Sequence, residues 1–514
     1  MATTLELGVL ALATWPVLRI LSIPSVRREY TGFAVLLGSA LVVYAGVLVA
    51  LALAFPALLA PLATLAAAGL LAERWRARPG YGKRRGLPPG SLSLFPRRPW
   101  TDHHFYLNQA ARFGPVFKLS LQYRPMVCVL GARLGTELLR EHAEVLEAPR
   151  VRFTRFIPRG FLRYMEPADH RIYKKLFQAS LSAELLRANE ERLAERVRTA
   201  LGALAARPDA AADSPSGGLS PRGPLRELFF VLLLGLFFAV EPESSDTAEL
   251  HALYTDLDIR KASWIPSQRD QRALARIYAW IRRRGPELEA ARARGETSPP
   301  CLLENVLRAR RDALDDETVL GQLAYMVEIG RADLTGLLVW VLKLLGDSPQ
   351  SAERLREDSR SGQVEEADAL AIRIVRETLR LEQSEYLYRR VKQDLSFRGF
   401  TIPKGWRIRV LIREGHRDPV SFPDPERFDP GRFLDASLRD ARYAPFGLGA
   451  HACIGSQVTE TLARIVLTEL AGGFDWRVTR DGPRKYGWAH WEPSSKLRIA
   501  LAAAPAGSGA GGRR

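Results

Sequence analysis

Near its C-terminus the 514-residue sequence reads Phe446-Gly447-Leu448-Gly449-Ala450-His451-Ala452-Cys453-Ile454-Gly455, directly ahead of a helical pattern at Val458–Leu470. Only the thiolate form of cysteine ligates a metal, and a cysteine at a helix N-terminus has its thiolate favoured by the macrodipole and by free N–H groups. The glycines let backbone amides approach the sulfur, and Phe446 is placed to cover it. We therefore expect Cys453 to bind a metal, the alternative being an ordinary buried core cysteine.

The same run fits the pattern F-x-x-G-x-H/R-x-C-x-G, and in this the chain resembles the cytochrome P450 family. The specified positions are occupied by Phe446, Gly449, His451, Cys453 and Gly455. The resemblance implies that these residues bind haem b (iron protoporphyrin IX), with the Cys453 thiolate as the iron ligand. It also implies a mainly α fold with small β-sheets. It covers roughly residues 89–500 and is strongest from 374 to 455.

Two upstream motifs agree with this resemblance in order and kind. Glu377-Thr378-Leu379-Arg380 matches the family's E-x-x-R, although such a spacing alone is usually a surface pair on a helix. Phe428-Asp429-Pro430-Gly431-Arg432-Phe433 resembles F-x-P-E-R-F, with glycine in place of glutamate. The resemblance implies that Glu377, Arg380 and Arg432 form a buried, structural charge network.

Haem propionates need cationic or hydrogen-bonding partners in a protein interior. His170 and Lys174 stand four residues apart, on one face of an expected helix, and resemble the family's propionate-binding pair. Arg389 and His451 complete the set that the resemblance implies. The family usually has arginine at the position of Lys174, and the alternative for this residue is an exposed surface lysine.

The expected central helix, around residues 326–345, departs from the family pattern A/G-G-x-D/E-T-T. The matching residues are Gly330-Arg331-Ala332-Asp333-Leu334-Thr335, so the acid is present but leucine replaces the first threonine. Asp333 and Thr335 are the candidate catalytic residues, and Thr335 serves only if a local bulge shifts the helix register. Arg331 is a candidate ligand for a substrate carboxylate, as in the peroxide-using branch of the family. Its alternative is an ion pair with Glu328 or Asp333.

The N-terminal region has the character of a membrane anchor. Tyr30 to Ala72 contains no charged residue, which is ~65 Å of helix, about twice a ~30 Å hydrocarbon core. We expect a transmembrane hairpin of Phe33–Phe55 and Ala57–Ala72, since Pro56 and Pro61 fall near the middle of the run, where a helix would break and turn. Cationic residues flank both ends, which places these ends and the catalytic domain on the cytoplasmic side. Residues 7–26 would lie in the interface or form a third span.

These features predict an anchor with a proline-rich hinge at residues 1–88, a haem-thiolate domain at 89–505 and a disordered tail at 506–514.

Lys and Arg number 74 against 57 Asp and Glu, a formal net charge of +17 that would suit anionic lipid or an acidic protein. We expect no nucleic-acid partner. The basic stretch 150–163 either binds an acidic substrate or lipid headgroups, or is a solvated loop face. Three separated cysteines, none in C-x-x-C, argue against a disulfide framework, a zinc site and an iron–sulfur cluster.

The predicted activity is that of a monooxygenase which uses dioxygen to oxidise a lipophilic small molecule, such as a fatty acid, terpenoid or steroid-like compound. No dinucleotide fingerprint is visible, so electrons would come from a separate ferredoxin or flavoprotein reductase. The first alternative is an enzyme that uses peroxide or rearranges an oxygenated lipid. The second is a haem-binding membrane sensor without turnover.

Overall fold

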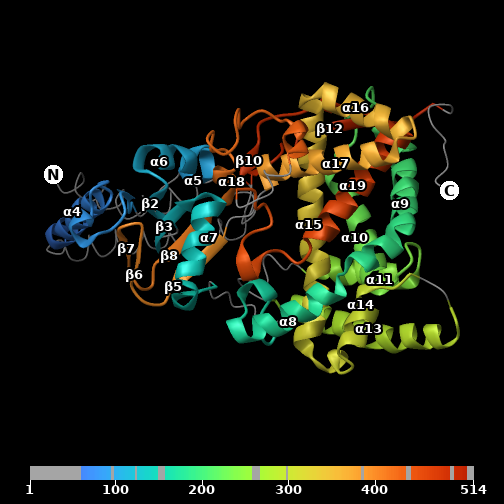
Figure 1. Cartoon of the computed structure of the whole chain (residues 1–514), viewed down its shortest axis with the longest axis horizontal. Coiled ribbons are helices and arrows are strands. Elements are labelled where there is room, and N and C mark those ends of the chain that lie inside the picture. Colours follow the sequence, from blue (N-terminus) through green and yellow to red (C-terminus); the bar gives the residue numbers. More distant parts are fainter. Residues whose placement is uncertain are drawn as a thin grey trace. The chain divides into compact units, whose positions relative to one another are not determined.

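The structure is a computed structural model, and its description covers most of the chain in two compact units, treated separately below (Figure 1). The first unit comprises the described parts of 1–147, 386–422 and 485–491, and the second comprises the remainder. The described residues are 59–93, 98–121, 124–148, 157–257, 267–296, 299–383, 387–435, 442–486 and 491–505.

The first unit is organised around a six-stranded sheet of order β1-β2-β3-β8-β5-β4. The apolar runs near residues 116 and 126 form β2 and β3, an antiparallel pair that is buried along most of its length. Strand β8 joins β3 in parallel, and the β6–β7 hairpin turns at Arg398 and Gly399, both with positive φ. The elements are β1 Gly90–Ser91, β2 Val116–Leu121, β3 Arg124–Leu130, β4 Leu146–Glu147, β5 Leu387–Val391, β6 Leu395–Phe397, β7 Phe400–Ile402, β8 Arg407–Leu411, α5 Arg98–Thr101, α6 Phe105–Phe113, α7 Gly131–Glu141 and α18 Ile412–Gly415.

A buried lysine fixes the hinge to this sheet. The side chain of Lys118 in β2 is 1% exposed, and its Nζ donates to the carbonyl of Pro88 at 2.6 Å and to that of Pro79 at 3.3 Å. The backbone N–H of Lys118 also donates to the Pro89 carbonyl at 2.7 Å. Burial lowers the pKa of Lys118 to about 8. The proline-rich segment is therefore held against β2 by both the backbone and the side chain of Lys118.

The anchor prediction is tested only in part by the described residues. Helix α4 (Leu59–Arg76) coincides with most of the second expected span and continues into a charged turn with Glu73, Arg74 and Arg76. Within the described ranges, no helix is long and apolar enough to cross a bilayer. The expected span Phe33–Phe55, residues 7–26 and the tail 506–514 lie outside the described residues.

The second unit is helical and surrounds the long helix α15 (Glu317–Asp347), which begins where Asp316 accepts a hydrogen bond from the Thr318 N–H at 2.8 Å. Helix α10 packs along α15, and α13, α16 and α17 contact it as well. The other helices are α8 Pro167–Ser180, α9 Ala183–Ala205, α10 Arg222–Phe238, α11 Ser245–Asp256, α13 Gln268–Ala293, α14 Leu302–Ala309, α16 Pro349–Arg360, α17 Val364–Thr378 and α19 Ser456–Gly473. Short strands complete this unit, in which β9 Phe474–Arg480 pairs with β12 Arg498–Ala503. Another two-stranded sheet is formed by β10 Lys485–Tyr486 and β11 Trp491–Glu492, of which residues 485–491 belong to the first unit.

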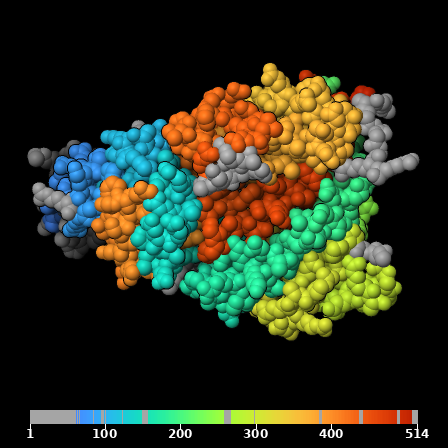
Figure 2. Space-filling model, in the orientation of Figure 1, coloured from blue at the N-terminus to red at the C-terminus, as the bar shows by residue number. Residues whose placement is uncertain are grey.

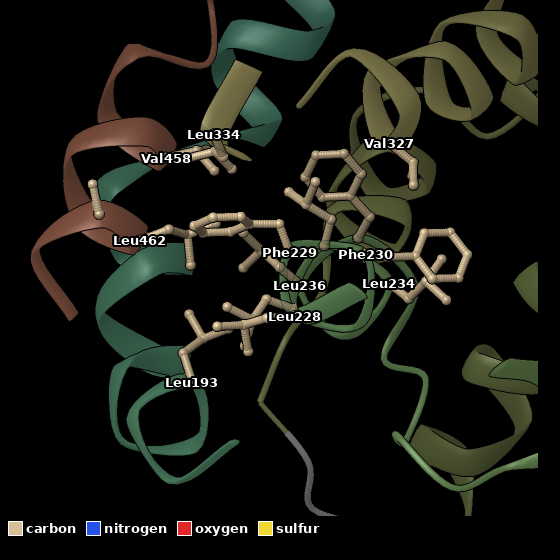
Figure 3. Close-up of a cluster of buried hydrophobic side chains, with 14 of the residues drawn as sticks. Leu193, Leu228, Phe229, Phe230, Leu234, Leu236, Val327, Leu334, Val458 and Leu462 are labelled. Carbon is tan, nitrogen blue, oxygen red and sulfur yellow. The ribbon is translucent and has the colours of Figure 1, made fainter. Parts of the chain in front are cut away.

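The core of this unit joins α10, α15 and α19. Figure 3 shows Phe229 and Phe230 of α10 among buried side chains of α15 and α19. Helix α10 is apolar on nearly all sides, as a helix enclosed by others must be. Figure 2 shows the deep red segment that contains α19 reaching the surface between the green α8–α9 region and the amber α16–α17 region. The α8–α9 and α16–α17 regions thus flank α19 and hold the loop that precedes it in position.

Candidate functional site

The loop before α19 presents the Cys453 side chain at the helix N-terminus. Cys453 is exposed, and its backbone N–H donates to the Phe446 carbonyl at 2.9 Å, which closes the loop. Gly447 and Gly449 adopt φ values of 88° and 61°, a region that favours glycine. A Cβ atom built on Gly455 would lie 3.7 Å from the Cys453 sulfur, so this glycine directly adjoins it. The loop therefore has the shape expected of a support for a ligating thiolate.

The other two cysteines occupy a different environment. Cys128 and Cys301 are both buried. Burial raises the pKa of both thiols, that of Cys301 to about 12, so neither forms a thiolate readily. Of the three cysteines, Cys453 alone has an accessible sulfur.

Helix α8 contacts this loop through two side chains one turn apart. The imidazole of His170 stacks on that of His451, with ring centroids 4.0 Å apart and an interplanar angle of 28°. The Lys174 Nζ donates to the Ala452 carbonyl at 2.9 Å and also to the Ala450 carbonyl. Three of the four predicted propionate partners are therefore brought together beside Cys453.

Arg389, the fourth predicted partner, belongs to β5 in the first unit. Its side chain is buried, and Nη1 donates to the Tyr388 carbonyl at 2.7 Å. Its role toward the cofactor stays a prediction.

Glu377, Arg380 and Arg432 meet in the second unit. Arg380 and Glu377 are fully buried and form a bidentate pair, with Nε–Oε2 at 2.7 Å and Nη2–Oε1 at 2.8 Å. The Arg432 Nε lies 3.4 Å from Glu377 Oε1, which also accepts from the Asp429 N–H at 2.9 Å. Arg380 lies in a π-helical turn, Leu379–Gln383, and donates to the Pro425 carbonyl at 2.8 Å. The network ties the end of α17 to the coil around the short helix η9 (Pro430–Leu434).

One face of α15 is open although the rest of the helix is buried. Between residues 318 and 342 the partly or fully exposed positions are Ile329, Gly330, Ala332, Asp333 and Gly336. Residues 329, 332, 333 and 336 share one helical face by their spacing, and Asp333 is the charged member of this open face. A Cβ atom on Gly330 would point toward Leu233 of α10, so this glycine lies at the edge of the open face. Two features of this unit suit a flat iron cofactor that is held by a thiolate. One is the exposed cysteine at a helix N-terminus, and the other is the open, mostly apolar face of the central helix.

The two residues that follow Asp333 point away from the open face. Leu334 is 2% exposed and belongs to the same buried hydrophobic cluster as Val458 of α19 (Figure 3). The Thr335 hydroxyl is buried and donates to the Arg331 carbonyl one turn back at 2.6 Å. Helix α15 is α-helical from Glu317 to Asp347, so the local bulge considered for Thr335 is absent. Its place as a catalytic residue remains a prediction.

Arg331 is enclosed by α10, α11 and its own helix. Its guanidinium pairs with Glu328 at 2.5 Å and lies over the rings of Phe230 and Tyr254, with centroid distances of 4.9 and 5.6 Å. Glu328 in turn accepts from Arg226 of α10 at 2.8 Å. Of the two interpretations of Arg331, the structure displays the ion pair with Glu328.

Sequence reasoning missed Tyr325, which lies one turn before Ile329 on α15. Its ring packs against that of Phe161, with ring centroids 3.9 Å apart and an interplanar angle of 55°. The pKa of its hydroxyl is raised chiefly by burial, then by Tyr164 and Asp333, and is opposed by Arg163. The only hint in the sequence was that Tyr325 stands four residues before Ile329. This spacing points to the site only once the open face of α15 is known.

A shallow cavity of about 280 Å³ was also missed. It adjoins the start of the cysteine loop and is lined by Arg376, Tyr443, Pro445, Phe446, Gly447 and Glu460. Arg376 and Glu460 form an ion pair at 2.9 Å across its wall.

Comparisons with known proteins indicate the family. A model of the cytochrome P450 family matches residues 300–489. Abscisic acid 8'-hydroxylase 3 of Oryza sativa subsp. indica is 26% identical over 435 residues, spanning 78% of this chain and 83% of that protein. Abscisic acid 8'-hydroxylase CYP707A1 of Solanum lycopersicum is 25% identical over 437 residues, spanning 77% and 87%.

Among solved structures, the retinoic-acid-bound cyanobacterial CYP120A1 superposes with a TM-score of 0.65 at 23% identity. The match spans 81% of this chain and 99% of that one, which supports the mainly helical fold with small sheets. The part of the chain that the family model matches holds both the loop around Cys453 and the Glu377–Arg380 pair, so residues 300–489 belong to the cytochrome P450 family of haem-dependent monooxygenases.

Proposed function

We propose that this monooxygenase oxidises a lipophilic carboxylic acid of terpenoid type, with haem held by Cys453. The observation that carries the proposal is the open face of α15, since it offers an apolar floor with one carboxylate, Asp333. A thiolate-held haem supplies the activation of dioxygen needed to insert one oxygen atom into a C–H bond. Residues of this chain would position the substrate over that face and deliver protons to the site of the reaction.

The carboxylate specificity is supported from two directions. The relatives named above are hydroxylases of abscisic acid, and the solved structure holds retinoic acid. On this chain, Arg163 lies close enough to Tyr325 to oppose the rise of its pKa, so a cation stands near one end of the open face. We assign the acid to Arg163 because of this proximity. Arg159, from the same basic stretch, pairs with Asp169 at 2.7 Å and serves as the comparison.

A ligand screen tests this specificity. We expect terpenoid acids to displace water from the iron and shift the Soret band, while their methyl esters bind more weakly. Loss of a charge-assisted hydrogen bond should make Arg163→Gln bind the acid about tenfold more weakly, with little change for the ester. Arg159→Gln is the matched control and should bind both like the wild type. Equal affinity of acid and ester in the wild type would refute the carboxylate specificity.

Turnover conditions separate the classes of function. Reductase-driven hydroxylation supports the monooxygenase, whereas turnover with peroxide alone supports the peroxygenase or rearranging enzyme. A protein that binds haem and ligand without any turnover would be a sensor. The ferredoxin or flavoprotein reductase is part of the proposal, because the family's hydroxylases use a separate electron donor.

Asp333, at the open face, is the residue we assign to proton delivery. General acid assistance contributes about 10²–10⁴-fold, so Asp333→Asn should lower coupled turnover within that range and divert electrons to peroxide. Thr335→Ala should have a small effect, because its hydroxyl already donates to the Arg331 carbonyl and faces the core. The measurement is product formed per NADPH consumed.

Leu334→Thr provides the contrast for this assignment. Because Leu334 is buried in the hydrophobic core, a hydroxyl there should cost stability without improving coupling. If Thr335→Ala collapsed coupling while Asp333→Asn did not, the assignment to Asp333 would be wrong.

Membrane attachment through residues 30–72, with the catalytic domain in the cytoplasm, is a further part of the proposal. It is supported by the uncharged run and its cationic flanks. Arginine at the centre of a span costs about 2.5–3.5 kcal/mol, so Leu41→Arg with Leu48→Arg should release the full-length protein from membranes at alkaline pH. The control Leu41→Ala with Leu48→Ala should stay bound. Retention of the arginine variant would locate the attachment elsewhere.

A further inference from the structure

Two side chains tie the end of helix α11 to the central helix α15. Tyr254 lies in the last turn of α11, and its buried hydroxyl donates to the Ala324 carbonyl of α15 at 2.9 Å. Arg331 of α15 extends in the opposite direction: its guanidinium lies over the Tyr254 ring, and its Nη2 lies 3.5 Å from the Tyr254 carbonyl oxygen. The last turn of α11 is thus held at two points of α15 that are about two helical turns apart.

These contacts lie beside the open face of α15. Each residue turns a helix by about 100°, so Ala324, Glu328 and Arg331 share one side of α15, about a quarter turn away from the open face. All three are buried, whereas the open face is not covered. Helix α11 therefore borders one edge of the space over the open face, and its distance from α15 sets the width of that space.

A buried carboxylate fixes the direction of Arg331. Glu328 pairs with Arg331 at 2.5 Å and accepts from Arg226 of α10 at 2.8 Å. The ring of Phe230, also from α10, covers the guanidinium with a centroid distance of 4.9 Å. A desolvated cation over aromatic rings is attracted by their negative faces, so the Tyr254 and Phe230 rings hold the guanidinium between α10 and α11. Arg331 therefore joins three helices at one point.

We propose that Arg331 is a positioning residue that holds the last turn of α11 against α15 and thereby sets the width of the substrate space over the open face. This inference rests on the proposed function, in which the open face is the floor of the substrate site. It differs from a role as a ligand for the substrate carboxylate, because the guanidinium is engaged by Glu328 and two aromatic rings. A positioning role affects an acid and its ester alike, whereas a carboxylate ligand affects the acid alone.

The test compares Arg331→Met with Arg226→Met in the full-length, haem-loaded protein. Both changes remove one guanidinium from Glu328, and the contacts described for Tyr254 come from Arg331. In Arg331→Met, hydrogen exchange of amides 250–256 should become about tenfold faster, since a desolvated cation over an aromatic ring is lost. Arg226→Met should exchange like the wild type in this segment.

Substrate binding provides the second readout. In Arg331→Met, the dissociation constants of a terpenoid acid and of its methyl ester, read from the Soret shift, should rise by the same factor of about tenfold, because the site is less preorganised. KM should rise with them while kcat stays the same, the pattern of a change in positioning rather than in chemistry. Arg226→Met should bind both compounds like the wild type.

Milder variants keep the inference testable if Arg331→Met folds poorly. Tyr254→Phe removes the hydroxyl that reaches Ala324 but keeps the ring under Arg331, so it should loosen α11 less than Tyr254→Leu, which removes both. Arg331→Lys keeps the positive charge and should retain part of the exchange protection and of the affinity for both compounds.

Two outcomes overturn the inference. If Arg331→Met weakens binding of the acid but not of the ester, with normal exchange in α11, Arg331 is a carboxylate ligand instead. If Arg331→Met lowers the urea midpoint but matches Arg226→Met in exchange and in both dissociation constants, its role is structural alone. Failure of the proposed function looks different: the wild type would bind neither compound, while Arg331→Met would still loosen α11.

Discussion

Replacing Cys453 with alanine is expected to abolish the thiolate-type absorption of the ferrous carbon monoxide complex and all reductase-driven turnover. The sulfur of Cys453 is exposed at the N-terminus of α19, where helix polarity favours its ionised form. The other two thiols are buried with raised pKa values and cannot replace it. The measurement is a difference spectrum of the reduced, carbon-monoxide-treated protein.

Cys301→Ala is the control for this experiment. Cys301 is buried at the start of α14, so its loss should lower stability modestly and leave the spectrum unchanged. A thiolate-type spectrum that persists in Cys453→Ala would show that another group ligates the iron.

Arg380→Met should produce the largest loss of stability among the charged residues of the site. Glu377 and Arg380 have no exposed side-chain surface, so removing the guanidinium leaves a buried carboxylate without its main partner. Breaking such a pair costs about 3–5 kcal/mol. We expect a clear fall in the urea midpoint and poor haem incorporation, measured on wild type and variant side by side.

Arg376→Met is the matched control, because Arg376 belongs to the same helix α17 but pairs with Glu460 in a partly exposed setting. Its loss should cost about 1 kcal/mol or less. The double replacement Glu377→Leu with Arg380→Met should recover only part of the stability, since the Pro425 carbonyl and the Asp429 N–H would still lose their partners. Equal losses in Arg376→Met and Arg380→Met would contradict the buried-pair interpretation.

Much of this site could be predicted from sequence because it depends on short-range chemistry. The glycines around Cys453 are required by positive φ angles inside the loop itself, and helix spacing alone places His170 and Lys174 on one face. The expected helix at 326–345 is present within α15. Such features need no knowledge of the neighbouring elements.

The direction of each side chain on α15 could not be predicted in this way. Each residue turns a helix by about 100°, so the motif at 330–335 does not indicate which residues face the cofactor and which face α10 or α19. Packing decides this: Leu334 is buried in the core cluster that includes Val458, and Arg331 is enclosed by aromatic rings from α10 and α11. For the same reason, the two interpretations of Arg331 were equally compatible with the sequence.

The contacts of Lys118 limit how the N-terminal region can be engineered. Its ammonium binds two carbonyls nine residues apart, those of Pro79 and Pro88, so the intervening segment has a fixed length and path. Inserting or deleting residues there would pull one carbonyl away and leave a buried cation with too few acceptors. A chimera that exchanges the N-terminal residues for a solubility tag should therefore be joined upstream of Pro79, with the native segment kept through Gly90.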